Sequence, residues 1–313
     1  MGLRLRAPRG EAGGFVAART PAALHARQPG GRSVTALQPA SVNTYGYIWS
    51  HTLRACLEQL APYGYRQFEG VINPPHLDVE ASARERRELK AYMQGEGLSF
   101  TSLNLPSLDT NLASPFAYTR DYTIALFQKA LILAADLGAP RLVTVPGRVN
   151  PLLPCPSDRS RAILRETIGA LIPLARNLGI KLAIENVPFA ALPHCRDIRE
   201  FLDEMSDTTL CACYDVANAH FAGESPAAGV ASLNGRIELV HCSDTTRNGW
   251  RHDPVGAGNV PFELLQDALQ AHGYEGPILL EIIAPDILPA ILSSHDALAR
   301  MNITSARQHQ HAG

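Results

Sequence analysis

The chain has 313 residues, of which 46% are hydrophobic and 19% charged, so it can bury a large core as a soluble protein. Its formal net charge of -2 at pH 7 argues against nucleic acid and anionic membranes as partners, because both favour basic surfaces. No apolar run is long enough to cross a bilayer. We therefore expect a small-molecule partner, and the length fits either two domains or one α/β barrel.

Both ends of the chain differ from the region between them. Residues 1–35 are rich in Arg, Ala and Gly with little periodicity, which is typical of a disordered or transit-like tail. Residues 301–313 also lack periodicity, and we interpret them as a C-terminal tail. The six cysteines show no paired CxxC spacing and follow no signal-peptide pattern. These features predict reduced thiols in a cytoplasmic protein and leave a homo-oligomer open.

Short apolar runs alternate with helical patterns from residue 36 to about residue 300. Strands that alternate with helices indicate parallel β-structure with crossover helices. The helical patterns span residues 53–64, 81–97, 122–139, 161–179, 198–206 and 262–273. The predicted strands are TALQPASV, YRQFEGVI, LSFTSLNL, RLVTVPG, KLAIENV, LCACYDV, IELVHCS and PILLEII. An open doubly wound sheet fits the alternation too, but eight units and the absence of GxGxxG after the first strand favour a closed (β/α)8 TIM barrel.

Four of these strands end in polar residues that could share one site: Glu185, Asp215, His241 and Glu281. Parallel barrel strands deliver their carboxyl ends to one rim, so these side chains are expected to meet there. Each alone has an ordinary explanation, such as a helix cap, a turn, a core histidine or an ion pair. Together, three carboxylates and an imidazole would repel and lose hydration unless a cation lay among them. Oxygen-rich ligation with one His favours Mn²⁺, Mg²⁺ or Co²⁺ over structural zinc.

These residues lie in motifs that resemble the xylose isomerase-like TIM barrels, over roughly residues 37–290. The motifs, in family order, are IEN (184–186), YDVANAH (214–220), VHCSD (240–244), HDPVGAG (252–258) and LLEI (279–282). The family includes sugar epimerases, inosose dehydratases and DNA repair enzymes of the endonuclease IV type. The resemblance implies that the four residues ligate one divalent metal ion, and we expect Mn²⁺ first, with Mg²⁺ or Co²⁺ as alternatives.

The sequence departs from the endonuclease IV type at three positions. Those enzymes need three zinc ions and further ligands, where this chain has Asn218, Val145 and Trp250. The resemblance therefore implies no trinuclear site and no activity on abasic DNA.

Five residues are candidates for substrate binding. Arg247 follows the metal-site His by six positions, as in the ketose 3-epimerase branch, and the resemblance implies that it holds a substrate oxygen; a solvated loop Arg is the alternative. His252 keeps the position of a family loop His, although a surface His is equally expected. Asn218 replaces a His of many sugar epimerases, His220 either compensates for it or caps the next segment, and Asn104 ends the third strand.

We hypothesise that Glu185 and Glu281 act as the catalytic base and acid on a metal-chelated hydroxy-ketone, a ketose, sugar or polyol derivative. A proton returned to the opposite face of the resulting enediolate gives epimerisation, and one returned to the next carbon gives isomerisation. Expulsion of a β-hydroxyl would instead make the protein a dehydratase of an inosose or dehydroshikimate-like cyclic ketone. A barrel that binds a sugar without turning it over is the third alternative.

Overall fold

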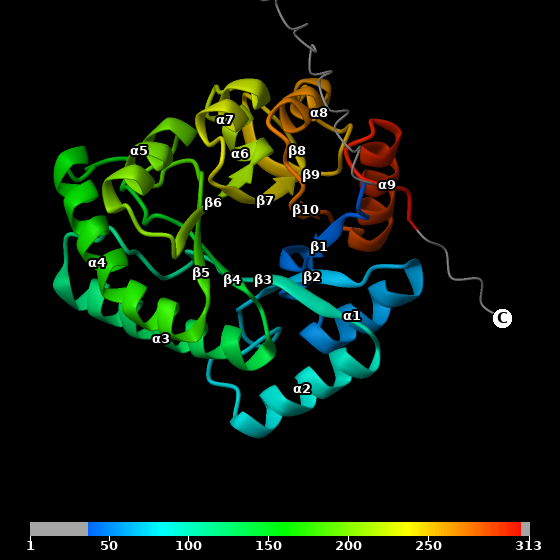
Figure 1. Cartoon of the computed structure of the whole chain (residues 1–313), viewed down its shortest axis with the longest axis horizontal. Helices are drawn as coiled ribbons and strands as arrows, with labels where there is room; N and C mark the ends of the chain where they lie inside the picture. The colour runs from blue at the N-terminus through cyan, green and yellow to red at the C-terminus, as the bar shows by residue number, and fades with distance from the viewer. Residues whose placement is uncertain (1–36, 308–313) are drawn as a thin grey trace, which may run out of the picture. The chain divides into compact units, whose positions relative to one another are not determined.

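The computed structural model describes residues 37–307, and the predicted N-terminal tail lies outside this range. Eight parallel strands close into a barrel in which β1 pairs with β2 on one side and β10 on the other (Figure 1). Each predicted strand overlaps one barrel strand, which confirms the (β/α)8 fold. The barrel strands are β1 (Ser41–Asn43), β2 (Gln67–Val71), β3 (Ser99–Leu105), β4 (Arg141–Thr144), β5 (Lys181–Glu185), β6 (Leu210–Asp215), β7 (Ile237–Cys242) and β10 (Ile278–Leu280).

Helices connect the strands and surround the barrel (Figure 1). All six predicted helical patterns form helices: α1 (Leu53–Leu60), α2 (Ala83–Gly95), α3 (Ala117–Leu137), α4 (Ser157–Leu178), α5 (Cys195–Met205) and α8 (Phe262–Ala271). The helices that were not predicted are α6 (Val216–Phe221), α7 (Pro226–Ser232), α9 (Ile287–Arg300) and the 3-10 turn η1 (Tyr45–Tyr47), whereas the 3-10 turn η2 (Ala61–Tyr63) lies within the first predicted pattern. In the part of the chain from 37 to 307, none of the helices is both long and apolar enough to traverse a bilayer.

Local sequence sets several helix ends. At the start of α2, the Ser82 hydroxyl accepts from Glu85 N at 3.3 Å and Glu85 Oε2 accepts from Ser82 N at 2.7 Å, which forms a capping box. The helices α3 and α4 end at Gly138 and Gly179, whose φ angles of 78° and 70° are left-handed. Glycine adopts this conformation without a Cβ clash, so it is a favourable residue at both helix ends.

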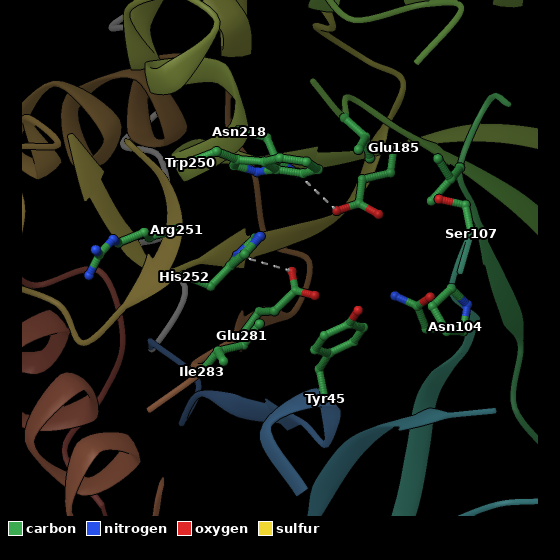
Figure 2. A pocket seen from close by; sticks show the side chains of 13 residues that line it. Tyr45, Asn104, Ser107, Glu185, Asn218, Trp250, Arg251, His252, Glu281 and Ile283 are labelled. Carbon is green, nitrogen blue, oxygen red and sulfur yellow. Dashed lines mark hydrogen bonds and ion pairs between the residues drawn. The ribbon is translucent and has the colours of Figure 1, made fainter. Parts of the chain in front are cut away.

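A two-stranded antiparallel hairpin, β8 (Asp244–Thr246) and β9 (Gly249–Asp253), follows β7 directly. It was not predicted, because its residues are polar and show no alternation. The carboxylate of Asp244 anchors the loop after it by accepting from Gly256 N at 2.8 Å and from Val260 N at 3.0 Å. The hairpin therefore holds Trp250 and His252 over the carboxyl end of the barrel (Figure 2).

The interior of the barrel has an apolar and a polar side. Small apolar residues pack together on the strands from β4 to β10: Val143, Ala183, Cys211, Cys213, Leu239 and Leu279. On β1, β2 and β3, hydrogen-bonded polar side chains take their place: Asn43, Glu69, Ser102 and Asn104. The cysteines of the described chain are free, in agreement with the predicted reduced thiols.

The first residues of the predicted C-terminal tail pack against the barrel. Ser305 N donates to Gln38 O at 3.0 Å, and the carbonyl of Ser305 lies 2.9 Å from His295 Nε2. Arg307 binds both carboxylate oxygens of Asp296 at 3.0 Å. Residues 301–307 thus extend the domain, whereas 308–313 lie outside the described residues.

Candidate metal centre and active site

The barrel brings the four predicted ligands together at its carboxyl end. Glu185 and Asp215 are the last residues of β5 and β6, His241 lies in β7, and Glu281 follows β10. One donor atom from each of the four lies within 4.8 Å of the others, and all four residues are buried. Within the described ranges, this is the one group of three or more His, Cys, Asp or Glu residues that could hold a metal ion.

Two asparagines fix the ends of β5 and β6 relative to each other. The side chain of Asn186 accepts from Asp215 N and donates to Asp215 O, both at 2.8 Å. Asp215 Oδ1 then accepts from Asn218 N at 2.6 Å and caps α6, while Asn218 Nδ2 donates to Glu185 Oε1 at 3.4 Å. Asp215 therefore uses one oxygen in the fold and leaves the other directed at the cluster.

Three atoms of the cluster are buried without a hydrogen-bond partner among the described residues: Asp215 Oδ2, His241 Nδ1 and Glu281 Oε2. His241 Nδ1 lies 2.8 Å from Glu281 Oε2, 3.4 Å from Glu185 Oε1 and 3.9 Å from Asp215 Oδ2. Buried polar atoms without partners are rare, because each loses its hydration without replacement. Their convergence on one point, with oxygen in the majority, fits a divalent cation.

The electrostatics of the cluster also call for positive charge. Burial raises the pKa of Asp215 to about 7 and raises the pKa of Glu185 above its ordinary value. Burial opposes charge on His241, yet Cys213, Glu69 and Glu281 raise the His241 pKa well above its ordinary value. Protons thus supply the compensating charge in the metal-free protein. A divalent cation would take over that role and release them.

Glu69 supports the cluster and was missed in the sequence. It lies fully buried on β2, where Oε1 accepts from Asn43 at 2.7 Å and from Asn104 at 3.0 Å, and Oε2 accepts from Ser102 at 2.5 Å. His241 Nε2 lies 3.2 Å from Glu69 Oε2, across the barrel interior. Burial alone would raise the Glu69 pKa, but His241 and the hydrogen bonds hold it below its ordinary value.

The contact with Glu69 determines how His241 faces the cluster. An ionised carboxylate only accepts hydrogen bonds, so the hydrogen of His241 must lie on Nε2. Once the imidazole is neutral, the lone pair of Nδ1 lies on the side of the other ligands. A Glu inside the inward-facing apolar strand QFEGV was the one sequence signal for this role.

A cavity of about 490 Å³ opens above the cluster, and Glu185 and Glu281 form part of its lining. Figure 2 shows both carboxylates turned toward the same space. Of the predicted substrate contacts, Asn104, Asn218 and His252 line this cavity.

His252 lies close to the cluster. Its Nδ1 lies 2.9 Å from Ser243 Oγ and 3.8 Å from both Glu281 Oε2 and Asp215 Oδ2. Tyr45, which was not predicted, also lines the cavity. Burial, with Glu281 and Glu185 nearby, raises the pKa of Tyr45, so its hydroxyl remains a donor.

The other two predicted contacts lie elsewhere. His220 is buried, with Nε2 2.8 Å from Asn259 Oδ1, and is absent from the cavity lining. Arg247 is exposed and donates to Gly223 O at 3.3 Å, also away from the lining. The structure therefore places three of the five predicted contacts at the cavity.

The positions at which the chain lacks endonuclease-type ligands face this same cavity: Asn218, Val145 and Trp250. Asn218 Oδ1 accepts from Trp250 Nε1 at 2.7 Å, so its amide oxygen is already occupied. Val145 and Trp250 offer no metal donor. At these three positions the cavity is lined by an amide, an aliphatic and an indole side chain.

Comparisons with known proteins agree with this architecture. An uncharacterized protein of Methanocaldococcus jannaschii is 25% identical over 241 residues, covering 74% of this chain and 79% of that protein. A probable endonuclease 4 of Mycobacterium ulcerans is 30% identical over 184 residues, covering 55% of this chain and 68% of that protein.

Similar solved structures include a D-tagatose 3-epimerase-like protein, with a TM-score of 0.75, 21% identity and coverage of 85% of this chain and 97% of that one. A D-psicose 3-epimerase solved in the presence of D-fructose has a TM-score of 0.72, 19% identity and coverage of 85% and 99%. The family model described as xylose isomerase-like TIM barrel matches residues 57–303. This chain therefore belongs to the xylose isomerase-like TIM barrel family.

Proposed function

We propose that the protein is a divalent-metal-dependent isomerase or epimerase of a hydroxy-ketone derived from a ketose, sugar or polyol. One observation carries the proposal: two buried carboxylates, Glu185 and Glu281, border both the candidate cation site and the 490 Å³ cavity. Groups that only bind a sugar need hydrogen-bonding capacity, whereas a pair of carboxylates around one reacting carbon can also move protons.

Asp215, His241, Glu185 and Glu281 would hold the ion. A bound Mn²⁺ or Mg²⁺ would supply a Lewis acid that polarises the substrate carbonyl and makes the adjacent C–H bond acidic. Asp215 and His241 are tied into the fold through α6 and Glu69, so they act as fixed ligands. Glu185 and Glu281 face the cavity and remain free to exchange protons with a substrate.

In the proposed mechanism, one glutamate removes the proton next to the carbonyl and the other returns a proton. Return to the opposite face of the same carbon inverts it. Return to the neighbouring carbon, with the hydroxyl proton passing to the former carbonyl oxygen, isomerises the substrate. Asn218 steadies Glu185 through its contact at 3.4 Å, and Tyr45 and Asn104 offer donors to substrate hydroxyls. Acid-base transfer of this kind contributes roughly 10²–10⁴-fold in rate.

Names of related proteins support this class over a nuclease. The similar solved structures include 3-epimerases and a 3-keto-D-glucoside 4-epimerase from E. coli, and the carboxylate pair here suits such chemistry. The curated endonuclease 4 relatives suggest DNA as a substrate. We consider DNA a poor candidate, because three positions that hold metal ligands in the endonuclease IV type are occupied in this cavity by Asn218, Val145 and Trp250.

Metal-dependent deuterium uptake tests the proposal. Mn²⁺-loaded protein is incubated in D₂O with ketoses and inososes, and products are read by mass and NMR. Deuterium at the carbon next to the carbonyl without loss of water is expected, and Glu281→Gln should abolish it while Glu263→Gln, on the exposed start of α8, should not. Loss of water would establish a dehydratase, and binding without either change would establish a binding protein.

A further inference from the structure

Three aromatic side chains gather beside the cavity. Phe189 comes from the β5–α5 loop, Phe221 ends α6, and Trp250 lies in β9. Their ring centroids are 5.9 Å apart for Phe189 and Trp250, 6.1 Å for Phe189 and Phe221, and 6.4 Å for Phe221 and Trp250. Trp250 itself lines the cavity with Glu185 and Glu281, whereas Phe189 and Phe221 pack against Trp250 just outside that lining. We call these three residues the aromatic rim.

Phe189 is unfavourable for folding in two ways. Its φ of 61° lies in the left-handed region, which is strained for any residue with a Cβ. Its side chain is also 57% exposed, so little apolar burial offsets that cost. The local structure needs only the Phe189 backbone, whose carbonyl accepts from Val149 N at 2.7 Å. Gly or Asn would provide the same carbonyl with less strain, so the phenyl ring has another use.

Trp250 is held in a fixed orientation relative to the reacting groups. Its Nε1 donates to Asn218 Oδ1 at 2.7 Å, and Asn218 Nδ2 contacts Glu185 Oε1 at 3.4 Å. The indole stacks on Phe221 with an interplanar angle of 23°. Figure 2 shows the indole between Asn218 and His252, next to the space that the two glutamates face. A substrate bound at the glutamates would therefore lie next to the indole of Trp250.

We propose that the aromatic rim is a subsite for the apolar C–H face of a ring, so that the substrate is a cyclic polyol ketone or a keto-pyranoside. Six-membered polyol rings present such a face, which packs on aromatic carbon with loss of hydration from both surfaces. A cavity of about 490 Å³ falls in the range of pockets that enclose ligands of this size or larger. A short open-chain hydroxy-ketone would occupy only the part of the cavity beside the candidate cation site and would not contact the aromatic rim. This inference rests on the proposed function for its reacting end.

The test uses Trp250 fluorescence, which reports binding without turnover. The chain has two tryptophans, and Trp49 is 76% exposed, so Trp49→Phe leaves Trp250 as the single reporter. With Mg²⁺ present, 2-keto-myo-inositol is the ring probe and L-erythrulose, which cannot close a six-membered ring, is the open-chain probe. We expect the ring probe to shift Trp250 emission and to bind at least tenfold more tightly.

Phe189→Gly in this background tests the rim directly. An aromatic contact is worth about 0.5–1.5 kcal/mol, so ring-probe affinity should fall about 2–10-fold. Erythrulose affinity should not change, and the melting temperature should stay the same or rise because the strained φ is relieved. Phe189→Asn, which also tolerates this φ, should behave alike.

Equal affinity of the two probes, or ring affinity unaffected by Phe189→Gly, would overturn the inference. Failure of the proposed function looks different. Tight binding of the ring probe that depends on Phe189, without deuterium uptake or water loss, would refute the proposed catalysis and support the aromatic rim as a binding subsite. The opposite outcome is deuterium uptake at similar rates in erythrulose and the ring ketone, with no effect of Phe189→Gly. It would support the proposed catalysis and refute the aromatic rim as a subsite. A Phe189→Gly change in self-association alone would assign these rings to a contact between two copies.

Discussion

In the half of the barrel formed by β1, β2 and β3, the buried carboxylate of Glu69 receives hydrogen bonds from Asn43, Ser102 and Asn104. In the half formed by β5, β6, β7 and β10, three buried polar atoms that could bind a metal ion lack a hydrogen-bond partner among the described residues. Both halves bury acidic side chains. They differ in whether the fold itself neutralises them.

This difference distinguishes a carboxylate that supports the site, Glu69, from the carboxylates proposed to bind metal and move protons. A carboxylate surrounded by donors is stable as an anion and cannot readily exchange protons or ligands. Buried carboxylate oxygens without donors are unfavourable as anions unless protons or a cation compensate their charge. His241 connects the halves, with Nε2 toward Glu69 and Nδ1 toward Glu281.

The largest effect is expected from Asp215→Asn, which removes one unpartnered oxygen from the ligand half. Asn is a good helix N-cap, so the bond from Asn218 N and the start of α6 should survive. Its NH₂ group would point a donor at the cation site. Metal binding, measured by calorimetry with Mn²⁺, should be lost, and activity should fall at least about 10³-fold with the charge stabilisation that the ion supplies.

Asp244→Asn is the matched control for that experiment. Asp244 is also a buried carboxylate at this end of the barrel, but it accepts from backbone N–H groups and offers no atom to the cluster. It should lower the melting temperature and leave Mn²⁺ affinity nearly unchanged. Equal loss of metal binding in both variants would mean that burial of charge, rather than ligation, distinguishes Asp215.

The stability of the metal-free protein should depend on pH because Asp215 and Glu185, two carboxylates of the four-residue cluster, have raised pKa values. In the metal-free protein the Asp215 pKa is about 7 against an ordinary 3.8, so the native state favours the protonated acid. The resulting stability is present below pH 4 and is lost as pH rises to 7, on the order of 4 kcal/mol from this group. The raised pKa values of Glu185 and His241 act in the same direction.

Metal should reverse this loss, because the cation replaces the protons. The difference in melting temperature between Mg²⁺-loaded and EDTA-treated protein should therefore grow from pH 5 to pH 7.5. Thermal scans of the wild type and of Asp215→Asn provide the measurement. A difference that shrinks over this range would show that protons do not compete for the cluster.

A smaller effect on metal affinity is expected from Glu69→Gln, which changes the hydrogen-bonded carboxylate in the half formed by β1, β2 and β3. The amide must turn an NH₂ group toward either His241 and Ser102 or toward two asparagine donors. Either choice weakens the hold on the His241 tautomer. Changes to such outer partners typically cost 10–100-fold in metal affinity.

Nitrogen NMR of His241 distinguishes this orienting role from a general loss of packing. Glu69→Gln should weaken Mn²⁺ binding and shift the ring toward the Nδ1–H form. Ser102→Ala removes one donor to Glu69 and leaves the acceptor for His241, so it should lower stability without changing the tautomer. An unchanged tautomer in Glu69→Gln would leave Glu69 with a packing role only.

The same difference explains what could be predicted from the sequence. Eight apolar runs separated by helical patterns were enough for the barrel, and the four candidate ligands stand out because each is a polar residue at or beside the end of an apolar run. The topology then brings them together without further information. Glu69 stands inside a strand, and its partner His241 is 172 positions away. Its role depends on the barrel closing, which no local pattern records.

The aromatic rim was beyond prediction for a related reason. Phe189, Phe221 and Trp250 come from a loop, a six-residue helix and a hairpin that were not predicted. Segments with neither 2-residue nor 3.6-residue periodicity give no orientation for their side chains. The candidate metal ligands could therefore be predicted from strand ends, whereas the proposed aromatic subsite could not.

The smallest effect is expected for a substitution of Arg247, for which the family resemblance and the structure lead to different expectations. The resemblance implies a contact with a substrate oxygen, while the structure leaves the guanidinium exposed beside Gly223 O and outside the cavity lining. Surface substitutions change free energies by about 0.5 kcal/mol or less, so Arg247→Ala should alter KM by no more than about twofold. A tenfold rise in KM, retained in Arg247→Lys, would show that the β8–β9 hairpin closes on the substrate and that the rim is shaped by binding.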